Sequence, residues 1–191
     1  MKRKPFVLVI SGPSGVGKST FVHALLESFP GLHFSVSATT RPRRPHELDG
    51  REYHFLAPEE FRRRQQADAF LEFAEVHGAL YGTLESEVSG ALRAGRSVLL
   101  DVDVQGGVHV KQRIPDAVLV FLLPPSLQVL AERLRRRGTE SADKIENRLA
   151  RAPQEIRALA AYDYVVVNDR IETTREDLCG EIGRASCRER V

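Results

Sequence analysis

The 191-residue sequence has no tryptophan, two cysteines and no long apolar run. Its longest apolar stretch, residues 117–123, is far shorter than the ~20 residues that a membrane span needs. The cysteines, Cys179 and Cys187, form no C-x-x-C pair, so we expect neither a disulfide framework nor a zinc site. The apolar segment after the charged first residues ends at residues 11–13, so we expect no export signal and a cytoplasmic protein.

An excess of charge of one sign is also missing. The chain has 28 Lys and Arg residues against 26 Asp and Glu, and 42% of its residues are hydrophobic. This composition predicts one globular domain, with or without small insertions, that buries its own core. The last ten residues, 182–191, depart from every preceding pattern, and we interpret them as a non-native tail. Their arginines account for the net charge of +2, so we expect no partnership with nucleic acid or a membrane.

Short apolar runs rich in β-branched residues alternate with segments in which apolar residues have helical spacing. We predict strands at residues 6–10, 97–102, 117–123 and 164–167, and helices at 19–29, 127–136, 144–161 and from residue 173. Strands separated by helices indicate an α/β fold with a mostly parallel sheet. Residues 39–94 change to short polar strands and turns, which we interpret as an inserted subdomain, and residues 135–143 are expected to form a mobile flap.

One motif decides the class of binding site. The stretch G-P-S-G-V-G-K-S fits the pattern G-x-x-x-x-G-K-[ST], and it lies between a predicted strand and a predicted helix, as that pattern requires. Its glycines let backbone N–H groups surround phosphate oxygens, while Lys18 would neutralise the phosphates and Ser19 would hold Mg²⁺. The expected nucleotide-binding residues are Gly12, Pro13, Ser14, Gly15, Val16, Gly17, Lys18, Ser19 and Thr20.

Two carboxylates, Asp101 and Asp103, follow the strand predicted at 97–102. The carboxyl end of a strand in such a sheet faces the ligand crevice, so one acid would support Mg²⁺ through water or accept a hydrogen bond from a base. The segment 103–106, D-V-Q-G, also resembles the D-x-x-G of GTPases, which makes a GTPase switch a rival interpretation. The guanine-reading N-K-x-D of that class is missing, because Asn168, Asp169 and the residue after them do not supply it.

Candidate acceptor-binding residues begin in the segment 35–44, S-V-S-A-T-T-R-P-R-R. It combines hydroxyls with Arg41, Arg43 and Arg44, as a phosphate-bearing substrate needs for bidentate contacts. A solvated charged loop remains an equal alternative for this feature alone.

The inserted region adds an aromatic, a carboxylate and hydroxyls at Tyr53, Glu72, Tyr81 and Thr83. A carboxylate can accept two N–H donors from the edge of guanine, and adenine does not offer that donor pattern. A guanine nucleotide therefore suits this region chemically.

Taken together, these motifs resemble the guanylate kinase family from about residue 5 to residue 180. The resemblance is carried by G-P-S-G-V-G-K-S, V-S-A-T-T-R-P-R-R-P, the turn at Tyr53, F-L-E-F-A, L-Y-G-T and D-V-D-V-Q-G. It implies ATP-dependent phosphorylation of GMP to GDP in purine nucleotide metabolism, on a P-loop kinase fold. It also implies a kinase core at residues 1–38 and 95–181, a GMP-binding subdomain at residues 39–94 and a lid at about residues 135–147.

The same resemblance implies roles for individual residues. Contacts to guanine are expected from Ser37, Glu72, Thr83 and Asp101, and contacts to the GMP phosphate from Arg41, Arg44, Tyr53 and Tyr81. Catalytic roles are expected for Lys18, Arg41 and the lid arginines Arg133, Arg137 and Arg148, and the adenine side of the ATP site for Asn168 and Asp169. Mg²⁺ is the implied cofactor, held by Ser19 and, through water, by Asp101. ATP and GMP are the expected partners, and the oligomeric state stays open.

Departures from the family pattern leave every charged group in place. Thr83 replaces the more usual Ser but keeps the hydroxyl, and His46 stands where Gly is common. We expect these changes to tune the acceptor site. A related binding module without catalysis is disfavoured by the intact Lys18 and Ser19, and a kinase of another phosphorylated acceptor remains the third rival.

Overall fold

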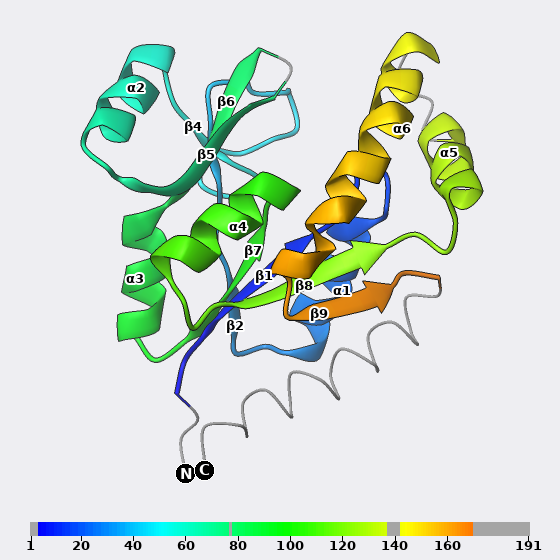
Figure 1. Cartoon of the computed structure of the whole chain (residues 1–191). Helices are drawn as coiled ribbons and strands as arrows, with labels where there is room; N and C mark the ends of the chain where they lie inside the picture. Colours follow the sequence, from blue (N-terminus) through cyan, green and yellow to red (C-terminus); the bar gives the residue numbers. More distant parts are fainter. Residues whose placement is uncertain (1–3, 77, 137–141, 170–191) are drawn as a thin grey trace.

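A computed structural model of the chain describes residues 4–76, 78–136 and 142–169. Its first sheet has five strands in the order β2-β7-β1-β8-β9, and each neighbouring pair is parallel (Figure 1). The strands are β1 (Val7–Ser11), β2 (Leu32–Phe34), β7 (Ser97–Asp101), β8 (Val118–Leu123) and β9 (Tyr164–Val167). This arrangement confirms the predicted α/β fold with a parallel sheet.

Helices cover both faces of the first sheet. They are α1 (Lys18–Ser28), α3 (Glu85–Arg93) and α4 (Val104–Arg113). On one face, Val7 and Val9 of β1 share a core with α3 and α4; on the other face, Leu8 and Ile10 share a core with α1. A strand buried on both faces accounts for the unbroken apolar run in the sequence.

A second sheet lies between β2 and α3 along the chain, with strand order β4-β3-β6-β5. Its strands are β3 (Ala38–Thr39), β4 (His54–Phe55), β5 (Phe70–Val76) and β6 (Ala79–Leu84), and α2 (Pro58–Gln66) precedes β5. The small core of this sheet is formed around Phe61 of α2, whose ring stacks on Phe70 with centroids 4.4 Å apart. Because α4 also contacts β5, the second sheet lies against the helices that cover the first sheet.

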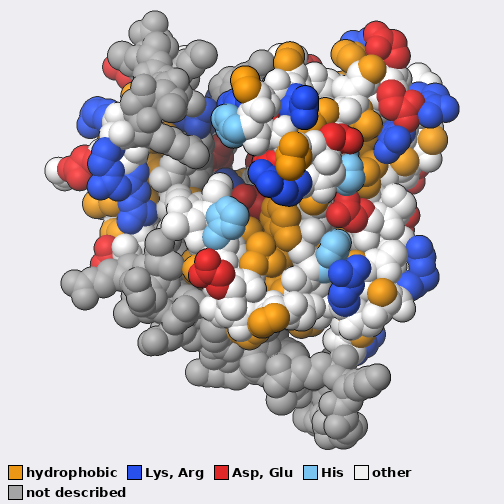
Figure 2. Space-filling view, turned by 180° about the vertical axis from the view of Figure 1, so that it is seen from behind, with side chains coloured by type: hydrophobic (Ala, Val, Ile, Leu, Met, Phe, Trp, Pro, Cys, Tyr) orange, Lys and Arg blue, Asp and Glu red, His pale blue; other side chains and the backbone are white. Residues whose placement is uncertain are grey.

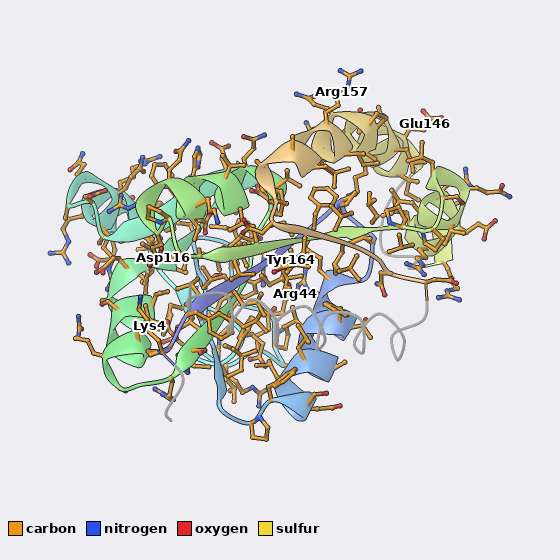
Figure 3. The ribbon with its side chains drawn as sticks, turned by 60° about the horizontal axis from the view of Figure 1, so that its bottom comes forward. Lys4, Arg44, Asp116, Glu146, Arg157 and Tyr164 are labelled. Atoms are coloured by element: carbon orange, nitrogen blue, oxygen red, sulfur yellow. The ribbon has the colours of Figure 1, made fainter. Side chains whose placement is uncertain are left out.

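Two further helices, α5 (Leu127–Arg136) and α6 (Ala142–Arg157), pack together through Leu130, Leu134 and Ala152. A 3₁₀ turn at Ala158–Ala161 joins α6 to β9. Glu146 and Arg157 mark the outer side of α6 in Figure 3. The helix expected from residue 173, both cysteines and the interpreted tail lie outside the described residues, as do residues 137–141 of the expected flap.

The surface carries mixed charges. Figure 2 shows basic and acidic side chains interspersed over the rear face of the molecule. Across the described ranges, no helix has both the length and the apolar character needed to cross a membrane.

Candidate active site

A cavity of about 1050 Å³ lies between the second sheet, the loop after β1 and helix α6, the elements seen in the upper half of Figure 1. The carboxyl end of β7 forms its floor. Eleven of the residues expected in the site line this cavity: Gly12, Ser14, Lys18, Ser37, Arg41, Arg44, Tyr53, Glu72, Tyr81, Asp101 and Arg148. The fold therefore brings the phosphate-binding motif and the expected acceptor residues to a single space.

The loop at residues 12–19, called the phosphate loop below, depends on close backbone approach. A Cβ on Gly12 would lie 2.5 Å from the carbonyl oxygen of Leu122, so no larger residue fits there. Gly17 has φ +100° and is the N-cap of α1, and it has no side chain that could cap the helix. The N–H groups of that first turn are thus available to an anion, and the Lys18 ammonium, which donates to the Gly12 carbonyl at 3.0 Å, stands beside them.

Two side chains outside the cavity wall hold this loop from behind. Arg133 donates to the carbonyls of Val16 and Asn168, both at 3.0 Å, and the Asn168 amide donates to Val16 at 2.8 Å. Asn168 is 4% exposed, and its Oδ1 has no hydrogen-bond partner in the described part of the chain. These residues brace the backbone of the loop, whereas Asp169 is exposed at the surface.

Not every expected residue is at the cavity. Four residues of the phosphate loop do not line the cavity: Pro13, Gly15, Val16 and Gly17. Two others, Ser19 and Thr20, are exposed. The Thr83 side chain is buried and contacts the cavity only through Glu72. Arg137 falls outside the residues that the structure describes.

One face of α6 completes the donor side of the cavity. Arg148 donates to the hydroxyl of Ser14, and Arg151 and Glu155 line the cavity next to it. Burial raises the pKa of Glu155, while the nearby Lys18 ammonium and a hydrogen bond from the Ser14 backbone oppose that shift. The sequence analysis missed Arg151 and Glu155, although their spacing from Arg148 places all three on one helical face.

The acceptor side contains a buried acid. Glu72 is 8% exposed and lies opposite Thr83 in the β5–β6 pairing, where the Thr83 hydroxyl donates to Glu72 Oε1 at 2.6 Å. Burial raises the pKa of Glu72 to about 7, although the hydrogen bond from Thr83 lowers it. A Cβ on Gly106 would lie 2.8 Å from Glu72 Oε2, so α4 approaches this carboxyl closely.

The segment that resembled a GTPase motif has a structural function here. Asp103 is the N-cap of α4, and its Oδ1 accepts a hydrogen bond from the Gly106 backbone at 2.7 Å. The glycine of D-x-x-G is explained by its close approach to Glu72, described above. Neither feature requires a nucleotide-sensing switch.

Arg41 and a group of aromatic side chains contact one another at the same cavity. The Arg41 guanidinium lies over the rings of Tyr53 and Phe55, 5.4 and 5.7 Å from their centroids. The rings of Tyr53 and Tyr81 meet edge to face at 5.8 Å. The sequence analysis did not single out the buried Glu47, which binds Arg41 through both carboxylate oxygens.

Oxygen donors near the phosphate loop suit a hard divalent cation. Burial raises the pKa of Asp101, and Lys18 opposes the shift, so a cation at this carboxylate would offset its desolvation. Ser19, the second residue of α1, carries a hydroxyl at the end of the same loop. The described residues include no cluster of three His, Cys, Asp or Glu side chains able to hold a metal.

Comparisons with known proteins agree with this geometry. The family model described as guanylate kinase matches residues 2–183. A guanylate kinase of Symbiobacterium thermophilum is 51% identical over 168 residues, which cover 88% of this chain and 80% of that protein. A guanylate kinase of Syntrophomonas wolfei is 45% identical over 188 residues, which cover 98% of this chain and 96% of that protein.

A solved structure matches the fold as well. The crystal structure of guanylate kinase from Anaplasma phagocytophilum superposes with a TM-score of 0.78 at 33% identity, covering 97% of this chain and 88% of that one. The resemblance inferred from the motifs is thereby confirmed. The chain belongs to the guanylate kinase family.

Proposed function

We propose that the chain transfers the γ-phosphoryl group of ATP to GMP, giving ADP and GDP. The observation that carries this proposal is a single cavity bounded both by a phosphate loop with Lys18 and by the buried acid Glu72. The loop suits a nucleoside triphosphate, and the acid suits the donor edge of guanine. Both substrates would therefore meet in one space.

Base selection is proposed to depend on Glu72. In its ionised form it accepts from the N1–H and 2-amino groups of guanine, whereas the acceptor at N1 of adenine would face a second acceptor. The Thr83 hydroxyl holds the carboxylate from behind. Ser37 and Asp101, on the neighbouring walls, complete the proposed base site.

The acceptor phosphate is proposed to bind between Arg41, Arg44, Tyr53 and Tyr81, which share one side of the cavity. Arginine offers a planar fork for phosphate oxygens, and the tyrosine hydroxyls donate single hydrogen bonds.

Transfer itself is proposed to depend on position and electrostatics. Charge that spreads over the transferring phosphoryl group would be stabilised by Lys18, by the first N–H groups of α1 and by Arg148. Arg133 would act through the loop backbone that it holds. The proposal also includes a lid at residues 135–147, with Arg137 as a lid arginine. It includes Asn168 and Asp169 on the adenine side of the ATP site.

Mg²⁺ is the proposed cofactor, with Ser19 and, through water, Asp101 as the protein groups that would hold it. When bound, it would neutralise charge on the phosphates. The reaction belongs to purine nucleotide metabolism, and we propose the cytoplasm as its location.

A coupled assay of ADP formation tests the function. The purified chain is supplied with ATP and Mg²⁺ and with GMP, AMP, UMP or no acceptor, and Lys18→Ala is the control. We expect turnover that requires GMP and that falls by about a thousandfold in Lys18→Ala. Hydrolysis of ATP without an acceptor, or no turnover by folded protein, would contradict the proposal.

A further inference from the structure

Glu47 is a buried acid beside the proposed acceptor phosphate site. It is 5% exposed and lies in the loop between β3 and β4. Its Oε1 accepts from Arg41 Nη2 at 2.8 Å, and its Oε2 accepts from Arg41 Nη1 at 3.0 Å and from the Arg44 backbone N–H at 2.8 Å. These donors lower the pKa of Glu47 to about 2, so the carboxylate stays ionised near neutral pH.

The contacts of Glu47 determine which edge of Arg41 remains for a ligand. Glu47 takes one hydrogen from each terminal nitrogen, and the Pro42 carbonyl accepts from Nη1 at 2.8 Å. A guanidinium has five N–H donors in one plane, so neither Glu47 nor Pro42 uses the Nε hydrogen and the second Nη2 hydrogen. The Tyr81 hydroxyl also interacts with Arg41, and both residues line the cavity, so the two side chains face a ligand together.

Because of Glu47, Arg41 and Arg44 contribute differently to the cavity. Arg41 and Glu47 together carry no net charge, and their ion pair fixes the direction of the guanidinium. The Arg44 side chain lines the same cavity and is exposed, and it makes no ion pair with any residue in the described ranges. Arg44 therefore supplies net charge, and Arg41 supplies a fixed pair of hydrogen-bond donors.

We infer that Glu47 is a positioning residue for the acceptor phosphate: it holds the Arg41 guanidinium so that the donors that Glu47 does not use meet the phosphate of GMP. Because the guanidinium is already fixed before the ligand binds, less side-chain conformational entropy is lost on binding. The inference rests on the proposed function, because it takes GMP as the acceptor.

Binding of GMP and of guanosine, measured by calorimetry on the full chain, separates this role from a purely structural one. Guanosine shares the base and lacks the phosphate. In Glu47→Gln we expect the Kd of GMP to rise about tenfold and the Kd of guanosine to stay unchanged. Glu47→Asp keeps the charge, so we expect a smaller rise in the Kd of GMP.

The chain offers a matched control in the same loop. Glu52 also binds an arginine and a backbone N–H, since it accepts from Arg51 at 2.6 Å and from Leu48 at 2.7 Å, but it does not line the cavity. Glu52→Gln should leave both dissociation constants unchanged. In an Arg41→Ala background, Glu47→Gln should have no further effect on GMP, because the residue acts through Arg41.

Three results would overturn the inference. Tighter GMP binding in Glu47→Gln would mean that Glu47 only cancels the charge of Arg41. Equal weakening of GMP and guanosine binding would mean that Glu47 supports the second sheet in general. Unchanged GMP binding would mean that Glu47 neither positions Arg41 for the phosphate nor supports the second sheet. If the unaltered chain failed to bind GMP, the proposed function would fail first, before any substitution is compared.

Discussion

The two sides of the cavity are built in different ways. On the acceptor side, polar and charged side chains hold one another: Thr83 donates to the buried Glu72, and Glu47 binds Arg41. On the donor side, the phosphate loop is held through its backbone, since Arg133 and other groups donate to loop carbonyls. The acceptor side should therefore respond to pH and to the loss of single charges, and the donor side to any change in backbone position.

Among the variants that test this comparison of the two sides, Glu72→Gln on the acceptor side is expected to have the largest effect. The amide keeps the shape of the carboxyl group but offers only one acceptor to two guanine donors. We expect kcat/KM for GMP to fall by about a hundredfold or more, because a buried polar mismatch discriminates strongly. Steady-state kinetics with GMP measure the effect, and the exposed Glu59→Gln on α2 is the control. A loss of less than threefold would mean that Glu72 does not read the base.

The same variant should gain stability. Burial raises the pKa of Glu72 to about 7, above the usual 4.5, so the folded state holds the proton more tightly than the unfolded chain. Ionisation of Glu72 therefore lowers the unfolding free energy. This loss is absent below pH 4.5, grows between pH 4.5 and 7, and reaches about 3 kcal/mol above pH 7. Urea unfolding from pH 5 to 8 should show the advantage of Glu72→Gln increasing and then levelling off. A difference that does not vary with pH would contradict this origin.

The sequence predicted the donor side better because its information is local. The phosphate loop is one contiguous motif, and the apolar runs around it predicted the parallel sheet. Glu72 and Thr83 become neighbours only through the β5–β6 register, which no local spacing reveals, so their assignment needed the family resemblance. Glu47 was missed because an acid in a polar, proline-rich loop is typical of a solvated surface.

The contacts of Arg133 could not be predicted from the sequence. Arg133 was expected from the resemblance as a catalytic lid arginine, and it does lie on α5. Its guanidinium points to the carbonyls of Val16 and Asn168 and does not line the cavity. Side-chain direction depends on the groups that need a donor in three dimensions, and a sequence pattern does not contain that information.

A moderate effect on the donor side is expected from Arg133→Lys. An ammonium cannot span two carbonyls with a planar fork, so one tie to the phosphate loop is lost. We expect the Kd of ATP to rise about tenfold while that of GMP is unchanged. Calorimetry with each nucleotide measures both values, and the exposed Arg93→Lys on α3 is the control. Equal weakening of both nucleotides would remove the distinction between the two sides.

The smallest effect concerns the joint between the two sheets, at Glu87 of α3. This carboxylate accepts from the Val36 backbone at 3.1 Å, bonds to His54 of β4 at 3.0 Å and lies 3.5 Å from His33 of β2. Glu87→Gln keeps one acceptor and loses the charge, so we expect unfolding free energy to fall by about 1 kcal/mol in urea denaturation.

The exposed Glu85 provides the comparison for this joint, because it occupies the same first turn of α3 and has the same relation to the helix dipole. If Glu87→Gln destabilises the chain more than Glu85→Gln and also weakens GMP binding two- to threefold, the carboxylate helps to place the acceptor side. Equal losses in the two variants would mean that the packing of α4 on β5 sets the position of the second sheet. In that case the acceptor side would depend on apolar packing at its joint and on paired charges only within the cavity.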